Sequence, residues 1–326
     1  MRNWLLPEHV DDVLPAEAEA LETLRRTLVD HLLRQGYRLV QPPLIEHLES
    51  LLTGSARDLD LQTFKVVDPL SGRMLGVRAD MTPQVARIDA HLLNTPGINR
   101  LCYAGSVLRA TPAPPGMMRE VMQVGAELFG EPGIAGDSEA IGLLLSTLAT
   151  ARLTGLHLDL GHVGVYRALA SGAGVLANGM DTDLFEAMRA KDLPGVQELT
   201  SRLPGAWRDA FTALAALYGP ADEVLPQARS ILPDTPAIAN ALDALDELAT
   251  TFAPAVEALH VDLADLRGYH YHNGPIFSVF TAGERNAIGN GGRYDGVGKL
   301  FGRARPATGF TLDLRQLHGV RAALAA

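Results

Sequence analysis

Two long strand-like segments joined by a short loop place the strongest constraint on how this chain folds. Residues 97–109 and 118–129 both look like strands, and residues 110–116, Ala-Thr-Pro-Ala-Pro-Pro-Gly, separate them. This loop is too rich in proline to pair, because proline has no backbone N–H to donate to a ladder. We therefore expect two strands of the antiparallel type here. The chain as a whole shows no regular alternation of strands and helices.

The region before this pair predicts a long helix and then an extended segment. Four leucines between Leu21 and Leu32 recur at helical spacing and predict a helix over residues 15–35. Pro15 suits the first turn of that helix, and Gly36 suits its C-terminal cap. The extended segment that follows contains Pro42-Pro43, which excludes a central strand position there.

Regular elements resume after the strand pair. Asp137 and Ser138 are candidate N-caps of a helix that runs to about Arg152, and Gly155 is expected to end it. Alternating or apolar runs predict further strands at residues 156–160, 256–266, 275–281 and 308–314.

The composition changes after about Val165. Residues 166–255 are rich in alanine and leucine at helical spacing, interrupted by prolines, and predict a small helical insertion. Residues 1–165 and 256–326 are then expected to form the core of the protein. Helices combined with antiparallel-type strands indicate the α+β class.

The charge balance argues against a nucleic-acid partner. The chain has 28 Lys+Arg against 38 Asp+Glu, a net charge of −10, whereas a nucleic-acid-binding protein needs a cationic track. Cys102 is the only cysteine, which excludes an intrachain disulfide and a cysteine-based zinc site and favours the cytoplasm. No apolar run is long enough for a membrane span, and the N-terminus does not fit a signal peptide.

Two glycine-rich segments resemble phosphate-binding motifs, and both fail. Gly289-Asn-Gly291 begins a dinucleotide fingerprint, but Tyr294 occupies the third glycine position. Gly298-Lys299 is similar to the end of a P-loop, but Leu300 follows it. These glycines are better explained as turn residues.

The segment around His270 and His272 has three readings. In an extended strip both imidazoles lie on one face, as two metal ligands would, although the absence of a nearby cysteine makes polar packing the better explanation. Arg267, Tyr269 and Tyr271 would then lie on the opposite face, where they could receive a small carboxylate and stack on a ring. An ordinary half-buried strand with a surface arginine explains the same pattern.

Alternation after Met118 places Arg119, Gln123 and Glu127 on one face of a strand. Polar residues at alternate positions usually mark a solvent face. Gly125 between Gln123 and Glu127 favours a second reading, because a missing side chain leaves room for something to lie on the strand. That face would offer acceptors and donors to an amine and an imidazole.

Longer strips resemble those of histidyl-tRNA synthetases, whose core is the class II synthetase fold with a mostly antiparallel sheet flanked by helices. Their two histidine-recognition segments correspond to Leu266–Phe277 and Gly291–Gly296, and the segment that binds the histidine α-amino group corresponds to Val77–Thr82. The dimer-forming motif 1 corresponds to Gly36–Pro43 with Glu46. Motif 2 corresponds to Val107–Glu127 and motif 3 to Thr308–Leu317. The resemblance implies that fold for nearly the whole chain apart from the helical insertion.

Three departures affect what the resemblance implies about ATP. Thr111 replaces the acidic residue that the synthetases use near the adenine, Gln316 replaces the arginine that grips the phosphates, and Asp313 replaces a glycine. A neutral amide cannot neutralise a polyphosphate, and Asp313 adds a repelling charge. The chain also stops ten residues after Gln316, so no C-terminal anticodon-binding domain is expected.

The amino-acid sequences of Arg78–Arg87 and Arg267–Gly274 resemble those of the regulatory subunits of ATP phosphoribosyltransferase, a family related to the synthetases. This resemblance implies a non-catalytic, histidine-binding subunit that forms a hetero-oligomer with a short-form catalytic subunit and allows feedback inhibition by histidine. No metal or cofactor is implied. Self-association, at least to a dimer, is expected through the strip around Pro43.

The resemblance also implies the histidine-binding residues. Asp80 and Glu127 would pair with the α-amino group, and either Arg109 or Arg267 with the carboxylate. Gln123 and Tyr271 would complete the hydrogen bonds, with His270 as a neighbour. Two other functions remain as alternatives: a free-standing paralogue that activates or ligates histidine, and a scaffold with a vestigial pocket.

Overall fold

The computed structural model describes residues 5–53, 57–112, 117–175 and 181–325. The chain divides into two compact units. Unit 1 comprises Met1–Thr154, Glu284–Gly289 and Asp295–Ala326, and unit 2 comprises Gly155–Gly283 and Asn290–Tyr294. Unit 2 thus contains the helices of residues 166–255 together with several strands.

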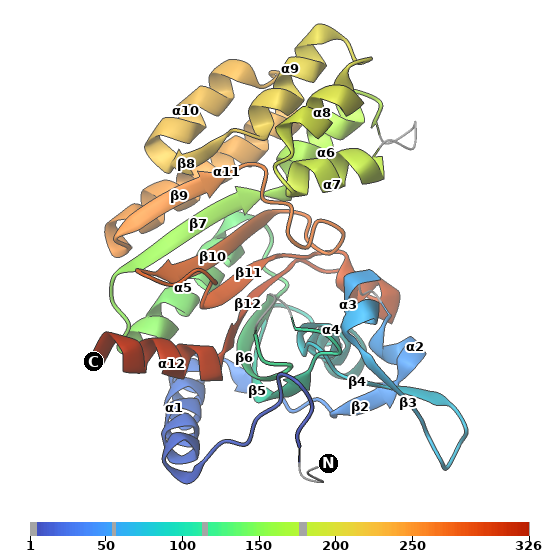
Figure 1. Cartoon of the computed structure of the whole chain (residues 1–326), viewed down its shortest axis with the longest axis vertical. Coiled ribbons are helices and arrows are strands. Elements are labelled where there is room, and N and C mark those ends of the chain that lie inside the picture. Colours follow the sequence, from blue (N-terminus) through green and yellow to red (C-terminus); the bar gives the residue numbers. More distant parts are fainter. Residues whose placement is uncertain (1–4, 54–56, 113–116, 176–180, 326) are drawn as a thin grey trace. The chain divides into compact units, whose positions relative to one another are not determined.

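The strands of unit 1 are built around the hairpin-type pair. They lie in the order β1 (Arg38–Leu39), β5 (Asn99–Leu108), β6 (Glu120–Phe129) and β12 (Ala307–Asp313) (Figure 1). β5 pairs with β6 and β6 with β12 in antiparallel register, whereas β1 pairs with β5 in parallel. The predicted antiparallel strand pair is confirmed, with β5 three residues and β6 two residues shorter than expected.

β1 lies at the edge of this sheet, as the Pro42-Pro43 pair requires. It ends at Leu39, and the next residue still donates from the Val40 backbone N–H to the Cys102 carbonyl at 2.9 Å. The prolines that follow have no N–H with which to continue the ladder. The strand therefore stops where the sequence predicts that pairing must stop.

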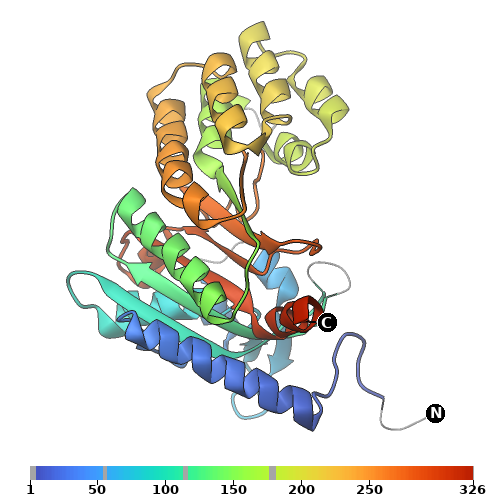
Figure 2. The same cartoon turned by 90° about the vertical axis from the view of Figure 1, so that its left-hand side faces the viewer.

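Three helices pack together on unit 1. They are α1 (Pro15–Arg34), α5 (Ile134–Thr150) and α12 (Leu314–Ala325), and α1 contacts both of the others (Figure 2). The predicted leucine stripe of α1 is buried. Gly36 has φ +87°, and the Tyr37 N–H reaches back to the Leu32 carbonyl at 3.1 Å, which closes the helix as predicted.

The predicted start of α5 is wrong by about one turn. The helix begins at Ile134, and Asp137 is buried within its first turn instead of capping it. Gly133, with φ +70°, turns the chain so that the helix begins earlier. At the other end Arg152, with φ +63°, takes the left-handed position that terminates the helix, a role predicted for Gly155.

A second, smaller sheet of unit 1 leads into the segment Val77–Thr82. Its order is β2 (Ile45–His47), β4 (Met74–Val77) and β3 (Phe64–Val67), all antiparallel, accompanied by α2 (Leu48–Leu51) and α3 (Arg57–Gln62). After β4 the chain enters α4 (Thr82–Arg87), which continues directly into the π-helix η1 (Ile88–Leu93). The short 3-10 helix η4 (Val297–Phe301) contacts both α4 and η1.

The strands of unit 2 form a ladder of mixed direction. β10 (Pro275–Thr281) pairs antiparallel with β7 (Leu156–His162), β7 parallel with β9 (Ala258–Asp262), and β9 antiparallel with β8 (Tyr218–Pro220), while β11 (Gly289–Arg293) lies next to β10. The predicted strand at 275–281 is confirmed, and the one at 256–266 is shorter than expected.

Helices make up most of the rest of unit 2. They are α6 (Val163–Gly172), α7 (Asp181–Arg189), α8 (Leu193–Thr200), α9 (Gly205–Leu214), α10 (Ala221–Ile231), α11 (Pro236–Phe252) and the short η3 (Ala253–Ala255). Pro194, Pro204 and Pro220 each lie at a helix start, where the missing N–H costs no helical hydrogen bond. Helices combined with mainly antiparallel strands confirm the predicted α+β class. No helix in the described ranges is long and apolar enough to cross a membrane.

We predict that unit 2 loses stability in mild acid because of His162. Its Nδ1 accepts from the Gly164 N–H at 3.0 Å and caps α6, and burial, followed by the Arg167 charge, lowers the pKa of His162 to about 4. Between pH 4 and its ordinary pKa near 6.5 the unfolded chain binds a proton there that the folded chain does not. Stability should therefore fall as pH drops through this window.

His162→Ser keeps a capping oxygen and removes the titrating ring. Urea unfolding of both proteins between pH 7 and pH 4 would check the prediction. The wild type should lose more stability than the variant, and equal losses would contradict the assignment to His162.

Candidate functional site

The candidate site of unit 1 is built on one face of the β5–β6–β12 ladder. Cross-strand register places Tyr103 opposite Gly125 and Glu127 opposite Gly309, while Gln123 lies between Gly105 and Asp313. Residues opposite each other in a ladder share a face, so these side chains form one surface. The loop from β4 to α4 brings Asp80 to the same surface.

Asp80 is held at the start of α4 by two neutral donors. Its Oδ1 accepts from the Gln123 Nε2 at 2.8 Å and from the Thr82 N–H at 3.2 Å. The Gln123 Oε1 in turn accepts from the Met81 N–H at 3.0 Å. Within the described part of the chain, these are the hydrogen-bond partners of the Asp80 side chain. Its negative charge is therefore not neutralised by a hydrogen-bonded cation there.

Glu127 is tied to the same cluster through Tyr103. The Tyr103 hydroxyl donates to the Glu127 Oε1 at 2.8 Å and lies 3.0 Å from the Thr82 Oγ1. Burial, and then the charges of Glu127 and Asp80, hold the pKa of Tyr103 well above its ordinary value. The phenol consequently stays protonated and supplies a donor to a buried carboxylate.

Burial decides between the two readings of this strand. Gln123 is 2% exposed and Glu127 is 1% exposed. The solvent-face alternative is therefore wrong, because a carboxylate on such a face would be hydrated. A buried carboxylate is costly unless hydrogen bonds hold it, so this arrangement calls for a reason beyond packing.

Two glycines make room for the cluster. A Cβ at Gly125 would overlap the Tyr103 ring and lie 2.7 Å from the Phe310 carbonyl, and a Cβ at Gly309 would overlap the Glu127 carboxylate. The space that the sequence predicts over Gly125 is thus present, and Tyr103 fills it. Sequence reasoning missed Tyr103 and Thr82. An aromatic residue opposite a glycine was the available signal for Tyr103.

Arg109 lies at the end of β5, on the face that carries Tyr103. Its backbone N–H donates to the Arg119 carbonyl at 2.8 Å, and its charge acts on the carboxyl group of Asp313. Arg119 itself stacks on Phe64, with its guanidinium carbon 4.8 Å from the ring centre. The structure therefore separates Arg119 from the Gln123–Glu127 cluster that alternation had grouped it with.

The motif 3 departures have local structural partners. Asp313 precedes α12 and accepts from the Arg315 N–H at 2.9 Å, while burial raises the pKa of Asp313. The Gln316 side chain donates to the Asn286 carbonyl at 3.4 Å. Thr111 is exposed. These contacts involve the chain itself and leave an amide and a carboxyl group where the synthetases have an arginine and a glycine.

The recognition strip of unit 2 is a series of turns, which corrects the predicted extended conformation. Gly268 has φ +63°, and its carbonyl accepts from the Tyr271 N–H at 2.8 Å and the His272 N–H at 2.7 Å. Side chains therefore do not alternate between two faces. Tyr269 is buried beside Tyr166, with ring centres 5.4 Å apart, instead of lining a ligand face.

The predicted site residues of this strip have different environments. Arg267 has a half-exposed side chain and forms an ion pair with Asp265, its Nε lying 2.9 Å from Oδ1. Tyr271 stacks on Tyr294 with ring centres 5.0 Å apart. His270 is exposed and packs on Phe185 at 5.3 Å, and the His272 Nδ1 lies 3.2 Å from the Arg293 carbonyl.

The side chains that the structure describes do not suggest a metal site. Among those residues, no group of three or more His, Cys, Asp or Glu is arranged to hold a metal ion. The two glycine segments also have local roles, since Gly289–Gly291 lies in β11 and Gly298–Lys299 in η4. What unit 1 offers is two carboxylates, Asp80 held by Gln123 and Glu127 held by Tyr103, which suit an amine.

Comparison with known proteins gives consistent names. A family model described as histidyl-tRNA synthetase matches residues 9–317. A Ralstonia nicotianae protein named ATP phosphoribosyltransferase regulatory subunit is 54% identical over 320 residues, covering 98% of this chain and 82% of the relative. A Thiobacillus denitrificans protein of the same name is 56% identical over 317 residues, covering 97% of this chain and 98% of the relative.

Solved structures show the same fold. A Bacillus halodurans C crystal structure, described as an ATP phosphoribosyltransferase regulatory subunit/histidyl-tRNA synthetase, matches with a TM-score of 0.85 and 27% identity over 97% of this chain and 82% of that chain. A histidine–tRNA ligase subunit from Alicyclobacillus acidocaldarius matches with a TM-score of 0.80 over both complete chains at 23% identity. The predicted class II synthetase-like fold is confirmed.

We predict that Tyr103→Phe destabilises unit 1 by about 1–3 kcal/mol, because it leaves a buried carboxylate without one of its donors. Tyr37→Phe is the matched control, since that hydroxyl donates to Glu139, whose side chain is 30% exposed. Denaturant unfolding at pH 7 measures both. A loss for Tyr103→Phe no larger than for Tyr37→Phe would show that the Glu127 contact does not stabilise the cluster.

Proposed function

This chain belongs to the family of ATP phosphoribosyltransferase regulatory subunits, and we propose that it binds histidine and transmits feedback inhibition to a separate catalytic subunit. The observation that carries the proposal is the pair of carboxylates, Asp80 and Glu127, held on one sheet face by Gln123 and Tyr103. A scaffold gains nothing from keeping a carboxylate as buried as Glu127, because desolvation opposes folding.

The histidine α-ammonium group is assigned to these two carboxylates. Asp80 accepts only neutral donors among the described residues, so an ammonium group would supply the missing positive charge. Charge-assisted hydrogen bonds of this kind are roughly twice as strong as neutral ones. The Gln123 amide, already fixed between Asp80 and Met81, orients the first carboxylate for this contact.

Arg109 is the better candidate for the histidine carboxylate. It directly follows β5 and lies on the same unit 1 face as Gln123 and Tyr103. Tyr271 and His270 of unit 2 stay predictions. A zwitterion removed from water needs both an anion and a cation, and Arg109 with Asp80 and Glu127 provides both.

Regulation requires a partner. We propose a hetero-oligomer with a short-form catalytic subunit, in the cytoplasm, with histidine as the effector. By linkage, histidine shifts the activity of such a complex only through different affinities for its conformational states. In this proposed complex, the histidine-binding site and the transferase active site lie on different chains.

We predict that the isolated chain binds histidine and that Glu127→Gln weakens binding roughly 10- to 100-fold, the effect of losing a hydrogen bond to a charged group. Calorimetry measures the affinity. Glu139→Gln is the matched control, because Glu139 also accepts from a tyrosine and lies on α5, outside the site. In the assembled transferase, Glu127→Gln should weaken inhibition by histidine and leave assembly unchanged.

No measurable histidine binding to the wild-type chain would overturn the proposed function. If Glu127→Gln and Glu139→Gln bound histidine equally well, the function could stand, but the site would be placed wrongly.

We predict that the chain does not activate histidine with ATP. Gln316 donates to the Asn286 carbonyl, and Asp313 adds a carboxyl group at the position where the synthetases have a glycine. Neither supplies the guanidinium that stabilises a transferring phosphate. Histidine-dependent pyrophosphate exchange above a protein-free blank would support the synthetase-like alternative instead.

We predict self-association through the strip around Pro43. Large apolar side chains are exposed in this strip and on β3: Leu39 of β1, Leu44, Ile45 of β2, and Val66 and Val67 of β3. Leu51, a few residues after Ile45 in the chain, is buried. Exposed apolar surface of this kind is typical of association surfaces.

Sedimentation at micromolar concentration should show at least a dimer, and Ile45→Lys should weaken it. Ile231→Lys is the control, because Ile231 is 43% exposed on α10 of unit 2 and Ile45 is 51% exposed. A monomeric wild type, or equal dissociation by both variants, would refute the predicted surface.

A further inference from the structure

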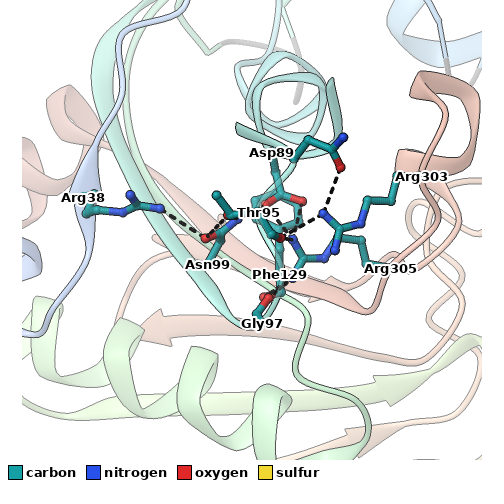
Figure 3. Close-up of polar contacts among 9 residues, drawn as sticks. Arg38, Asp89, Thr95, Gly97, Asn99, Phe129, Arg303 and Arg305 are labelled. Carbon is teal, nitrogen blue, oxygen red and sulfur yellow. Dashed lines mark hydrogen bonds and ion pairs between the residues drawn. The ribbon is translucent and has the colours of Figure 1, made fainter. Parts of the chain in front are cut away.

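A buried ion pair lies in the helical segment that follows Asp80. The Arg305 Nη1 lies 3.1 Å and 3.2 Å from the two carboxylate oxygens of Asp89, a residue of η1 (Figure 3). The two side chains are 7% and 1% exposed. Removing one partner of such a pair leaves an uncompensated buried charge, so the pair fixes the position of η1 firmly.

A second residue holds the same carboxylate. The Asn99 Nδ2 donates to the Asp89 Oδ1 at 2.5 Å, and the Asn99 Oδ1 accepts from Thr95 at 3.0 Å and from Arg38 at 3.1 Å (Figure 3). Asn99 begins β5, so Asp89 is attached directly to the strand that carries Tyr103. The η1 helix thus cannot shift along that strand without breaking this network.

The Arg305 guanidinium binds a carboxylate and two backbone carbonyls at once. Its Nη2 donates to the carbonyls of Gly97 and Phe129, the latter at 3.5 Å. A Cβ at Gly130 would overlap the same guanidinium. The fork of an arginine can serve carboxylate and carbonyls together, whereas a lysine offers a single ammonium group. Arg305 therefore connects Asp89 to the end of β6.

The α4–η1 segment, Thr82–Leu93, is consequently bound to one ladder at two points. At its start, the Met81 N–H binds Gln123, and Thr82 contacts Tyr103. In the first turn of η1, Asp89 is bound through Asn99 and Arg305 to the ends of β5 and β6. Glu127 lies on β6 between these attachments, two residues before Phe129. The two attachments together set where Asp80 stands relative to Glu127.

We propose that Asp89 and Arg305 are positioning residues for histidine binding, acting through α4–η1 on the placement of Asp80. This inference rests on the proposed histidine-binding function and extends it to residues outside the ligand cluster. A single ammonium group must reach both Asp80 and Glu127, and hydrogen bonds weaken steeply with distance and angle. A helix released at Asp89 would present Asp80 less favourably.

The π-helical form of η1 fits this role. The Asn94 N–H donates to the Asp89 carbonyl at 2.9 Å, a spacing of five residues, and Asn94 ends the helix with φ +43°. Such wide turns are uncommon and occur frequently at functional sites. Here the Asp89 backbone and side chain are bound separately, the carbonyl within the helix and the carboxylate by the strand ends.

The test is a double-mutant cycle on histidine affinity. The variants are Arg305→Lys, Asp80→Asn and their combination, each measured by calorimetry with L-histidine at a temperature where thermal unfolding shows the protein folded. Arg305→Lys should raise the Kd about tenfold in the wild-type background. In the Asp80→Asn background it should change the Kd less than about twofold, because the group it positions has lost its charge.

Arg303→Lys is the matched control. Arg303 lies in the same loop and donates to the Asn94 side chain at 3.1 Å and the Thr95 carbonyl at 2.9 Å, without contacting Asp89 (Figure 3). It should leave the Kd within about twofold of the wild type. If Arg305→Lys fails to fold, the apolar pair Asp89→Leu with Arg305→Met replaces it, since such swaps of buried ion pairs are often tolerated.

Two results would overturn this inference and leave the proposed function intact. The first is an unchanged Kd for histidine in folded Arg305→Lys. The second is an equal rise in Kd from Arg305→Lys in the wild-type and Asp80→Asn backgrounds, because that would indicate a structural role only. An absence of histidine binding by the wild-type chain would instead refute the proposed function, and the positioning role with it.

Discussion

The burial of one carboxylate, that of Glu127, constrains several other positions of unit 1. Tyr103 must donate to it, Gly125 must lack a side chain so that Tyr103 can lie on the strand, and Gly309 must lack one beside the carboxylate. Thr82 then fixes the phenol from α4. Buried polar groups are stable only in fully connected networks, so these positions depend on one another.

The same dependence explains why α4 and η1 are held at two points. Gln123 binds the start of α4, and Asn99 and Arg305 bind Asp89 in the first turn of η1. A short helix of this kind has little stability of its own, because nucleation is costly and few hydrogen bonds follow. Its position is therefore set by polar contacts with the strands.

The departures from synthetase chemistry have a structural counterpart. Asp313 accepts from the Arg315 N–H at the start of α12, and Gln316 binds the Asn286 carbonyl. Both residues contribute to local structure while they remove a cation and add a carboxyl group. The ladder that holds Gln123 and Glu127 does not depend on an arginine at position 316 or a glycine at position 313, so the fold is compatible with both departures.

The sequence by itself determined the α+β class, the antiparallel strand pair, and the leucine stripe of α1 with its Gly36 cap. It also supplied Asp80, Gln123 and Glu127 as candidate site residues. Hydrophobic periodicity, glycine positions and long motifs are local signals, so a sequence is enough to read them. Tertiary structure alone decided that the Gln123 face is buried, that Tyr103 fills the space over Gly125, and that Asp89 meets Arg305. It also turned the His270 strip away from an extended form, through the positive φ of Gly268. Such outcomes depend on contacts between residues far apart in sequence, which no local pattern contains.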